Sequence, residues 1–567
     1  MAAGSVRKRR FRHRLIALLT TALCLWAVAA APAASAHATV VSTTPADNSL
    51  LQTAPDRVSI TFSEPVELQL GALRVFAPDG TQAEVGSAEH LDGKPDTASV
   101  PLRGGLKDGT YVVSWRVISA DSHPVRGAFT FSVGTRSTPN SGGAEAAPSG
   151  DRTVGLLFGV ARWLAYLGFA AMAGGAFLLI AFAPKLAGDV RLRRLIGGGW
   201  FVLLVGTVFA LLLQGPYAGG FGLGRAFDVD VLRATLHTRL GRALAWRLIL
   251  LGGVGVLVSW IATRLTEAVV RTRQVVGALA AALAVALAVT WSIADHSGTG
   301  SQVALALPAD VLHLLAMATW VGGLTALTVA ILGGAGELEP DERLTVVRRF
   351  STTAFVAVCV LATTGVYQGW RQVRHWDSLF NTDYGRLLII KSSIFLVLLS
   401  LGFLARRILA ATTPDLARLR RSVAAEFGLA VVVLAVTALL VESQPAADTP
   451  QKAKPASATS PFDTGSANGS GTVNITLDPA GVGQDTLHIY VLDKNGAAES
   501  VPEVTASLAL PAQQLGPLPV KLDVTGPGHY TGAGAVLPMA GKWQVLVTVR
   551  TTDIDQATVI LNVDVSK

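Results

Sequence analysis

Hydrophobic and polar positions alternate in two parts of the chain and give way to long apolar runs between them. Near the N-terminus, the alternation covers Val58-Ile60-Phe62, Tyr111-Val113-Trp115-Val117 and Phe129-Phe131-Val133. A period of two residues is typical of half-buried β-strands. We therefore predict an all-β domain over residues 37–134, an immunoglobulin-like sandwich or barrel.

The same alternation returns near the C-terminus in Val473-Ile475-Leu477, Leu487-Ile489-Val491 and Trp543-Val545-Val547-Val549. It predicts a second all-β sandwich, over residues 461–567. Two stretches of small polar residues and proline, 135–152 and 443–460, are typical of linkers and separate the β domains from the apolar middle of the chain.

Residues 153–442 contain apolar runs of about 20 residues or more, the length that a bilayer core requires of a helix. They predict a membrane domain of eight spanning helices. The predicted spans are 154–183, 195–214, 243–263, 275–294, 305–332, 351–370, 386–405 and 421–441.

The first 36 residues have the layout of a secretory signal peptide, with a basic start, an apolar middle and the small residues Ala34-Ser35-Ala36 at the end. Cleavage after Ala36 makes His37 the first residue of the mature protein. A short uncleaved anchor is the alternative. With the signal directing the first β domain outward, the four loops predicted to be cytoplasmic hold fifteen Lys and Arg, against six in the three outer loops. This bias predicts a plasma-membrane protein with both β domains extracytoplasmic.

Charge and cysteine content exclude two further classes of protein. Six of the positive charges behind the formal net charge of +8 lie in residues 1–36, which contain no acid, so +2 remains for the mature chain. A nucleic-acid partner is therefore not expected. The two cysteines are Cys24, in the signal, and Cys359, in an apolar segment, so the mature chain has no internal disulfide.

A terminal histidine offers its α-amine and its imidazole to the same ion. Asp121 and His123 are two residues apart, so on extended backbone their side chains face the same side. An amine, two imidazoles and a carboxylate suit Cu(II). The domain has a net charge of −4 and contains no methionine, so a thioether site for Cu(I) is not expected in it. The alternative is that Asp121 and His123 are ordinary turn and loop residues.

Four stretches resemble the CopC family of periplasmic copper-binding proteins. They are His37, Thr44-Pro45-Ala46-Asp47-Asn48, Thr61-Phe62-Ser63-Glu64-Pro65-Val66, and Trp115 to Gly127 with its Asp121-Ser122-His123-Pro124 segment. The resemblance implies a Cu(II) site made of His37, Asp121 and His123. Glu64 matches a nearby acid of the family, in the outer shell of such a site.

Polar side chains within a span are costly and are functional candidates by default. His313 and Met317 are four residues apart, on one helix face, and an imidazole with a thioether favours Cu(I). A packing histidine with a gap-filling methionine is the alternative. His296 lies at the outer end of the fourth span. This part resembles the CopD copper-resistance family in His313 with Trp320-Val321-Gly322-Gly323, Phe350-Ser351 with Thr364-Gly365, and Tyr384-Gly385-Arg386 with Lys391.

The two resemblances together imply a protein that binds Cu(II) outside the cell and passes copper inward through the bilayer, with a copper chaperone or reductase as partner. It is not expected to be an enzyme. One alternative is a copper-dependent oxidative enzyme with an N-terminal histidine brace; another is a haem or redox protein with His296 and His313 as axial ligands. The C-terminal domain is similar to YtkA-like β domains. Its His529 and Met539 are interpreted as turn and packing residues, with metal binding as the alternative.

Overall fold

The computed structural model divides the chain into two compact units, Met1–Thr449 and Pro450–Lys567. Each unit has a hydrophobic core of its own. The structure describes residues 38–69, 71–120, 122–137, 152–299, 302–332, 338–373, 376–410, 416–443, 445–446, 454–466 and 469–566.

The first unit begins with the predicted all-β domain, in which two sheets enclose one core. One sheet has the strand order β1-β3-β6, and the other has the order β2-β8-β7-β4 with β5 paired to β7. The strands are β1 (Val40–Thr44), β2 (Ser49–Leu51), β3 (Arg57–Phe62), β4 (Val66–Glu67), β5 (Leu73–Phe76), β6 (Thr97–Pro101), β7 (Gly109–Ser119) and β8 (Pro124–Val133).

The apolar positions of the predicted alternation form this core. Val58, Ile60 and Phe62 on β3 are all at most 2% exposed. Across the core, the Trp115 ring on β7 meets the Phe62 ring edge-on, with centroids 5.4 Å apart. The alternation therefore predicted the strands and the buried face of β3, whereas β7 is buried on both faces.

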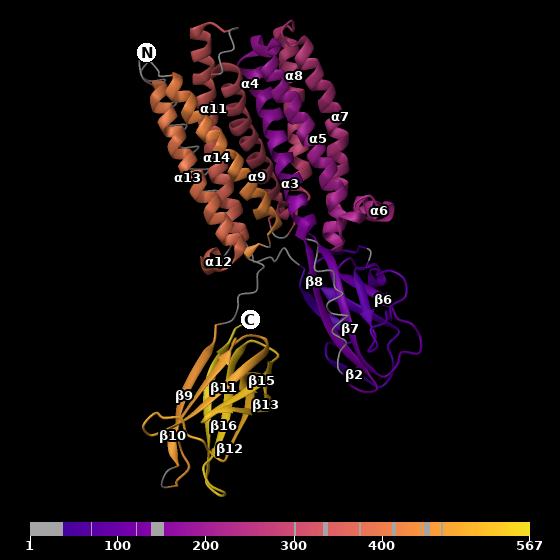
Figure 1. Ribbon diagram of the computed structural model, residues 1–567, viewed down its shortest axis with the longest axis vertical. Helices are drawn as coiled ribbons and strands as arrows, with labels where there is room; N and C mark the ends of the chain where they lie inside the picture. Colours follow the sequence, from indigo (N-terminus) through magenta and orange to yellow (C-terminus); the bar gives the residue numbers. More distant parts are fainter. Residues whose placement is uncertain are drawn as a thin grey trace. The chain divides into compact units, whose positions relative to one another are not determined.

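Within the described residues, eight helices are long and apolar enough to cross a bilayer, as predicted. Several run beyond the predicted spans, because a helix continues past the apolar stretch that defines the membrane core. The first span consists of α3 (Arg152–Phe169), η2 (Ala170–Gly174) and α4 (Gly175–Ala181), and the fifth consists of α9 (Val303–Met317), η6 (Ala318–Gly322), α10 (Gly323–Ala326) and η7 (Leu327–Leu332). The other six spans are α5 (Val190–Gly219), α7 (Arg239–Arg264), α8 (Val270–Ser292), α11 (Pro340–Val373), α13 (Asp383–Ala410) and α14 (Leu416–Glu442). Figure 1 shows them packed as one bundle.

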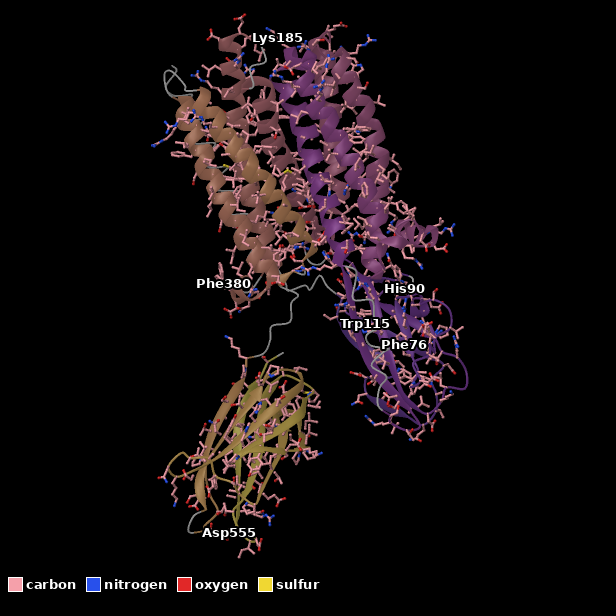
Figure 2. The ribbon with its side chains drawn as sticks, viewed as in Figure 1. Phe76, His90, Trp115, Lys185, Phe380 and Asp555 are labelled. Carbon is pink, nitrogen blue, oxygen red and sulfur yellow. The ribbon has the colours of Figure 1, made fainter. Side chains whose placement is uncertain are left out.

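The connecting segments lie at two ends of the bundle. Lys185, between the first and second spans, is at the opposite end from Phe380, on the short helix α12 (Trp376–Asn381) between the sixth and seventh spans (Figure 2). The short helix α6 (Val229–His237) precedes α7, and the single turn η5 (His296–Gly298) follows α8. The bundle therefore has the alternating up-and-down course that the eight predicted spans require.

Two π-helical turns, η2 and η6, cross at close range inside the bundle. A Cβ on Gly322 would overlap the carbonyl oxygen of Ala170, and a Cβ on Gly174 would overlap that of Ala318. Only glycine permits this backbone approach, which explains Gly322, whereas a Cβ on the next residue, Gly323, would overlap the Phe350 ring. Such π-helical turns occur frequently at functional sites, and η6 begins directly after Met317.

The second unit is an all-β sandwich of a five-stranded sheet, β14-β15-β11-β10-β9, and a four-stranded sheet, β13-β12-β16-β17. The predicted alternation is confirmed, since Val473, Leu487 and Trp543 are fully buried. The strands are β9 (Ala456–Asp463), β10 (Ser470–Asp478), β11 (Gly483–Asp493), β12 (Glu503–Leu510), β13 (Leu515–Val520), β14 (Asp523–Gly526), β15 (His529–Leu537), β16 (Gly541–Arg550) and β17 (Gln556–Val565).

The linker predicted over 443–460 ends earlier than expected. Strand β9 begins at Ala456 and pairs with β10 from the register pair Ala456↔Leu477 onward. Its inward residues, Ala456 and Ala458, pack against the core. The composition of small residues hid this strand, because alanine and serine give no apolar alternation.

We expect Gly322→Ala to destabilise the membrane unit by about 1–3 kcal/mol, because an added methyl group in a closed contact forces the two π-helical turns apart. The thermal unfolding midpoint of the detergent-solubilised protein measures this. The matched control is Gly253→Ala on α7, where an added Cβ meets nothing within 4 Å. An equal midpoint for the two variants would contradict the close crossing.

Candidate metal centre

The segment that carries His123 is a tight turn between β7 and β8. The Ser119 amide donates to the His123 carbonyl over 2.9 Å, and the Ser122 amide donates to the Ser119 carbonyl over 2.9 Å. Ser122 has φ 71, in the left-handed region that favours glycine. The expectation of extended backbone here is therefore wrong at Ser122, because the chain must reverse within five residues to join the two strands.

The His123 side chain is only 6% exposed, and its Nε2 lies 2.7 Å from the carbonyl oxygen of Val441, near the end of α14. A carbonyl only accepts, so Nε2 carries a proton and Nδ1 carries the lone pair with which a neutral imidazole binds a metal. Histidine ligands usually donate their other ring nitrogen to such an oxygen, which orients the ring. This arrangement suits a metal ligand.

Two further side chains attach this β domain to the ends of the helices. Ser122 Oγ donates to the carbonyl of Ala294, just beyond α8, over 2.8 Å. The Arg116 guanidinium donates to the carbonyls of Tyr217 and Ala218, at the end of α5, over 2.9 and 2.6 Å. Burial lowers the pKa of Arg116, and the neighbouring Arg126 acts in the same direction. The turn is thereby fixed against three helix ends.

Arg239, at the start of α7, connects the turn to the segment after α8. Its guanidinium donates to the carbonyls of Ala120 and Gly298 over 3.2 and 2.7 Å, and its amide donates to Glu67 Oε1 over 2.6 Å. Burial raises the pKa of the Glu67 carboxyl, an effect that the hydrogen bond from Arg239 partly offsets. From the other side, Glu64 Oε1 accepts the Ala120 amide over 3.4 Å, directly before Asp121.

Of the predicted outer ligands, the structure describes His123 alone. His37 and Asp121 lie outside the described residues, so the predicted set of three ligands stays a prediction. His296 is on the turn η5, and its side chain is also outside the description. Among the residues that the structure does describe, no three His, Cys, Asp or Glu side chains gather closely enough to hold an ion.

An ion pair lies within the bundle, next to the Ala294 carbonyl that the turn contacts. Arg162 on α3 contacts Asp295, one residue after Ala294, with 2.9 Å between Nη2 and Oδ1, and the two side chains are 10% and 14% exposed. Glu442, one residue after Val441, interacts electrostatically with Arg162. The turn at His123 therefore contacts carbonyls that are each one residue away from an acid of the bundle, Asp295 or Glu442.

Asp310 lies on α9, in the fifth span, and is held by neighbouring helices. Its Oδ2 accepts from Ser292 Oγ on α8 over 2.6 Å, and its Oδ1 accepts from Gln368 Nε2 on α11 over 3.1 Å. Lys391 on α13 adds an electrostatic interaction from a fourth helix. Hydrogen bonds from two neighbouring helices therefore hold this carboxylate in place.

One helical turn further along α9, His313 Nδ1 lies 2.8 Å from Thr364 Oγ1 on α11. The Thr364 hydroxyl donates to the Val360 carbonyl over 2.7 Å, so Nδ1 of His313 donates to Thr364 and Nε2 keeps its lone pair. Met317 follows one turn later and is 8% exposed. Asp310, His313 and Met317 thus share one face of α9 at helical spacing. We call this set the α9 donor row.

The sequence analysis predicted His313 and Met317 as candidate ligands within a span. It did not identify Asp310, Arg162 or Asp295 as polar residues of the bundle interior. The available signal was the cost of a charge within a span, which applies to Asp310 as strongly as to His313. Asp310 is also three residues from His313, on the same helix face. The partners of Asp310 could not be found in this way, because Ser292, Gln368 and Lys391 are far away in the chain.

Comparison with known proteins identifies two domains. A family model described as the CopC domain matches residues 40–134, and one described as copper resistance protein D, CopD, matches residues 344–440. The copper transport protein CutJ of Bacillus subtilis is 27% identical over 483 residues, which cover 83% of this chain and 85% of that protein.

Two further similarities concern the N-terminal domain. The copper resistance protein C of Pseudomonas syringae pv. tomato is 33% identical over 105 residues, which cover 18% of this chain and 82% of that protein. The crystal structure of CopC from Methylosinus trichosporium OB3b aligns at 26% identity with a TM-score of 0.16, covering 18% of this chain and 99% of that one.

We expect Arg239→Gln to loosen the turn at residues 119–123. A hydrogen bond from a charged donor contributes about 1.5–3 kcal/mol, so losing the bond to the Ala120 carbonyl should raise amide hydrogen exchange in this segment roughly tenfold or more. Peptide-resolved exchange on the full chain measures it. The control is Arg233→Gln on α6, an exposed arginine paired with Asp230. Unchanged exchange in the turn would contradict the role of Arg239.

Proposed function

The chain belongs to the CopC family of copper resistance proteins and joins its CopC domain to a CopD membrane domain, and we propose that it binds Cu(II) outside the cell and passes copper inward across the plasma membrane. The main support for this proposal is the hydrogen bond between the His123 imidazole and the Val441 carbonyl. It attaches the turn with the proposed metal ligand to the end of a membrane span.

The proposed outer site consists of the His37 amine and imidazole, the Asp121 carboxylate and the His123 imidazole. The tautomer of His123 supports this proposal, since the Val441 carbonyl holds the proton on Nε2 and leaves Nδ1 to bind the ion. Signal cleavage is then an activation step, because the α-amine exists only after cleavage. Glu64 is the proposed outer-shell acid, since it holds the backbone of Ala120.

The proposed path continues from Asp295 and Glu442 to the α9 donor row. Its donors change from the carboxylate of Asp310 through the imidazole of His313 to the thioether of Met317. Oxygen donors suit hard cations and sulfur donors suit Cu(I), so this order favours copper that is bound as Cu(I) at the deeper end. Reduction of Cu(II) then requires a reductase outside the membrane, and a cytoplasmic copper chaperone is the expected acceptor.

The net charge of the CopC domain supports inward passage of copper. The CopC domain has a net charge of −4 and raises the local concentration of cations next to the helix ends. The oxidative-enzyme alternative fits less well, because the turn with His123 packs against helix ends rather than facing a polymeric substrate. For the haem alternative, we expect the purified protein to lack a Soret band. The YtkA-like resemblance of the second unit stays a prediction.

Acetylation of the His37 amine should weaken Cu(II) binding at the outer site, because the nitrogen that binds the metal becomes an amide nitrogen. We expect a loss greater than the 10–100-fold that removal of an outer-shell partner typically costs. Titration of the full-length protein followed by electron paramagnetic resonance measures the affinity, and His90→Ala is the control. Equal affinity with and without the acetyl group would rule out the proposed ligand set.

Asp310→Asn should abolish copper accumulation by cells, since the amide removes the charge that the path offers to a cation. Cu(II) binding by the CopC domain should stay unchanged, which separates passage from capture. Cellular copper is measured at limiting metal in a strain that lacks its own copy, and Cys359→Ser, at an exposed position on α11, is the control. Wild-type copper accumulation by Asp310→Asn would refute passage along α9.

A further inference from the structure

The sheet β14-β15-β11-β10-β9 of the second unit brings together two histidines that are 41 residues apart in the chain. His488 is on β11 and His529 begins β15, the neighbouring strand (Figure 1). In the register of these strands, His488 is opposite Thr531, and His529 is opposite Tyr490. Residues two apart on a strand face the same side, so both imidazoles lie on one face of the sheet.

The ring nitrogens of the two histidines are close enough to share an ion. His488 Nδ1 lies 3.3 Å from His529 Nε2, and the ring planes differ by 22°. Two nitrogens bound to one metal at about 2.0–2.1 Å are roughly 2.9 Å apart at a right angle and roughly 3.3 Å apart at a tetrahedral angle. The separation of the rings is thus within the range for two ligands of one ion.

The neighbours of His529 favour the tautomer that a metal ligand needs. Thr525 Oγ1 lies 3.1 Å from His529 Nδ1 and donates to the His529 carbonyl over 3.3 Å. When Nδ1 donates to Thr525, Nε2 of His529 accepts the hydrogen bond from His488 Nδ1, and a metal ion bound between the two rings would replace the proton of that bond. Tyr490 stacks on the other side of the His529 ring, with centroids 4.3 Å apart and planes 6° apart, and holds its orientation.

We propose that His488 and His529 form a second copper site, on the second unit, which binds Cu(II) through His488 Nδ1 and His529 Nε2 with water at the remaining positions. Two imidazoles are borderline ligands, and among divalent first-row metals such ligands bind Cu(II) most tightly. Both side chains are half-buried, so solvent reaches the pair. The site extends the chain's copper binding beyond its CopC domain and does not depend on the proposed path through the membrane.

The test compares copper content between variants of the full-length protein, so that copper held elsewhere in the chain cancels. We expect His488→Ala with His529→Ala to hold one Cu(II) per chain fewer than wild type after gel filtration, and to lose one imidazole-nitrogen signal set in electron paramagnetic resonance. The matched control is His237→Ala, an exposed histidine on α6. Wild-type copper content in the double variant, or removal of this copper by equimolar Zn(II), would overturn the proposal.

A second pair of variants tests the site without removing a ligand. Thr525→Val takes away the acceptor that orients His529, and we expect a 10–100-fold loss of Cu(II) affinity at this site. Its control, Thr548→Val, removes a similar hydroxyl pair on the other sheet, where Thr548 contacts Thr558 over 2.8 Å. Equal Cu(II) affinities for the two valine variants would overturn the role of Thr525 and the site with it.

Discussion

The hydrogen bond between the His123 imidazole and the Val441 carbonyl joins the CopC domain to the helix bundle of the first unit. It selects the tautomer of His123 and attaches the turn to α14 at the same time. From the β domain, Arg116 donates to the end of α5 and Ser122 donates to the Ala294 carbonyl, just beyond the end of α8. In the other direction, Arg239 on α7 donates to the Ala120 carbonyl of the β domain. A metal ion held on this turn would therefore lie next to the membrane helices without any movement of the domain.

The polar contacts inside the helix bundle reflect the high cost of burying polar side chains away from water. Two acids of the proposed path have partners on other helices: Asp295 has Arg162, and Asp310 has Ser292 and Gln368. These partners keep the acids in place before an ion arrives. The close crossing of η2 and η6 has a different cause, because the glycines there let the backbones of the first and fifth spans meet directly after Met317.

The sequence predicted the large elements well because their patterns are strong. Apolar and polar residues alternate along β3, β7, β10 and β16, and eight long apolar runs lie between the two β domains. These patterns are compatible with few other folds. The prediction was wrong where the chain turns, at Ser122, since a positive φ at serine has no sequence signature. It was also wrong at Ala456, where a strand of small residues resembles a linker. The pairs His488–His529 and Asp310–Gln368 depend on tertiary contacts, which a single sequence does not contain.

The central claim is that copper captured by the outer domain is the copper that crosses the membrane. The most direct measurement is a single-turnover transfer in proteoliposomes. The outer site of the full-length protein is loaded with one equivalent of radioactive Cu(II), free metal is removed and a reductant is added outside. The account predicts that the label appears inside the vesicles with the wild-type protein. Label that stays on the outer domain, or leaves only to the outer solution, would contradict it.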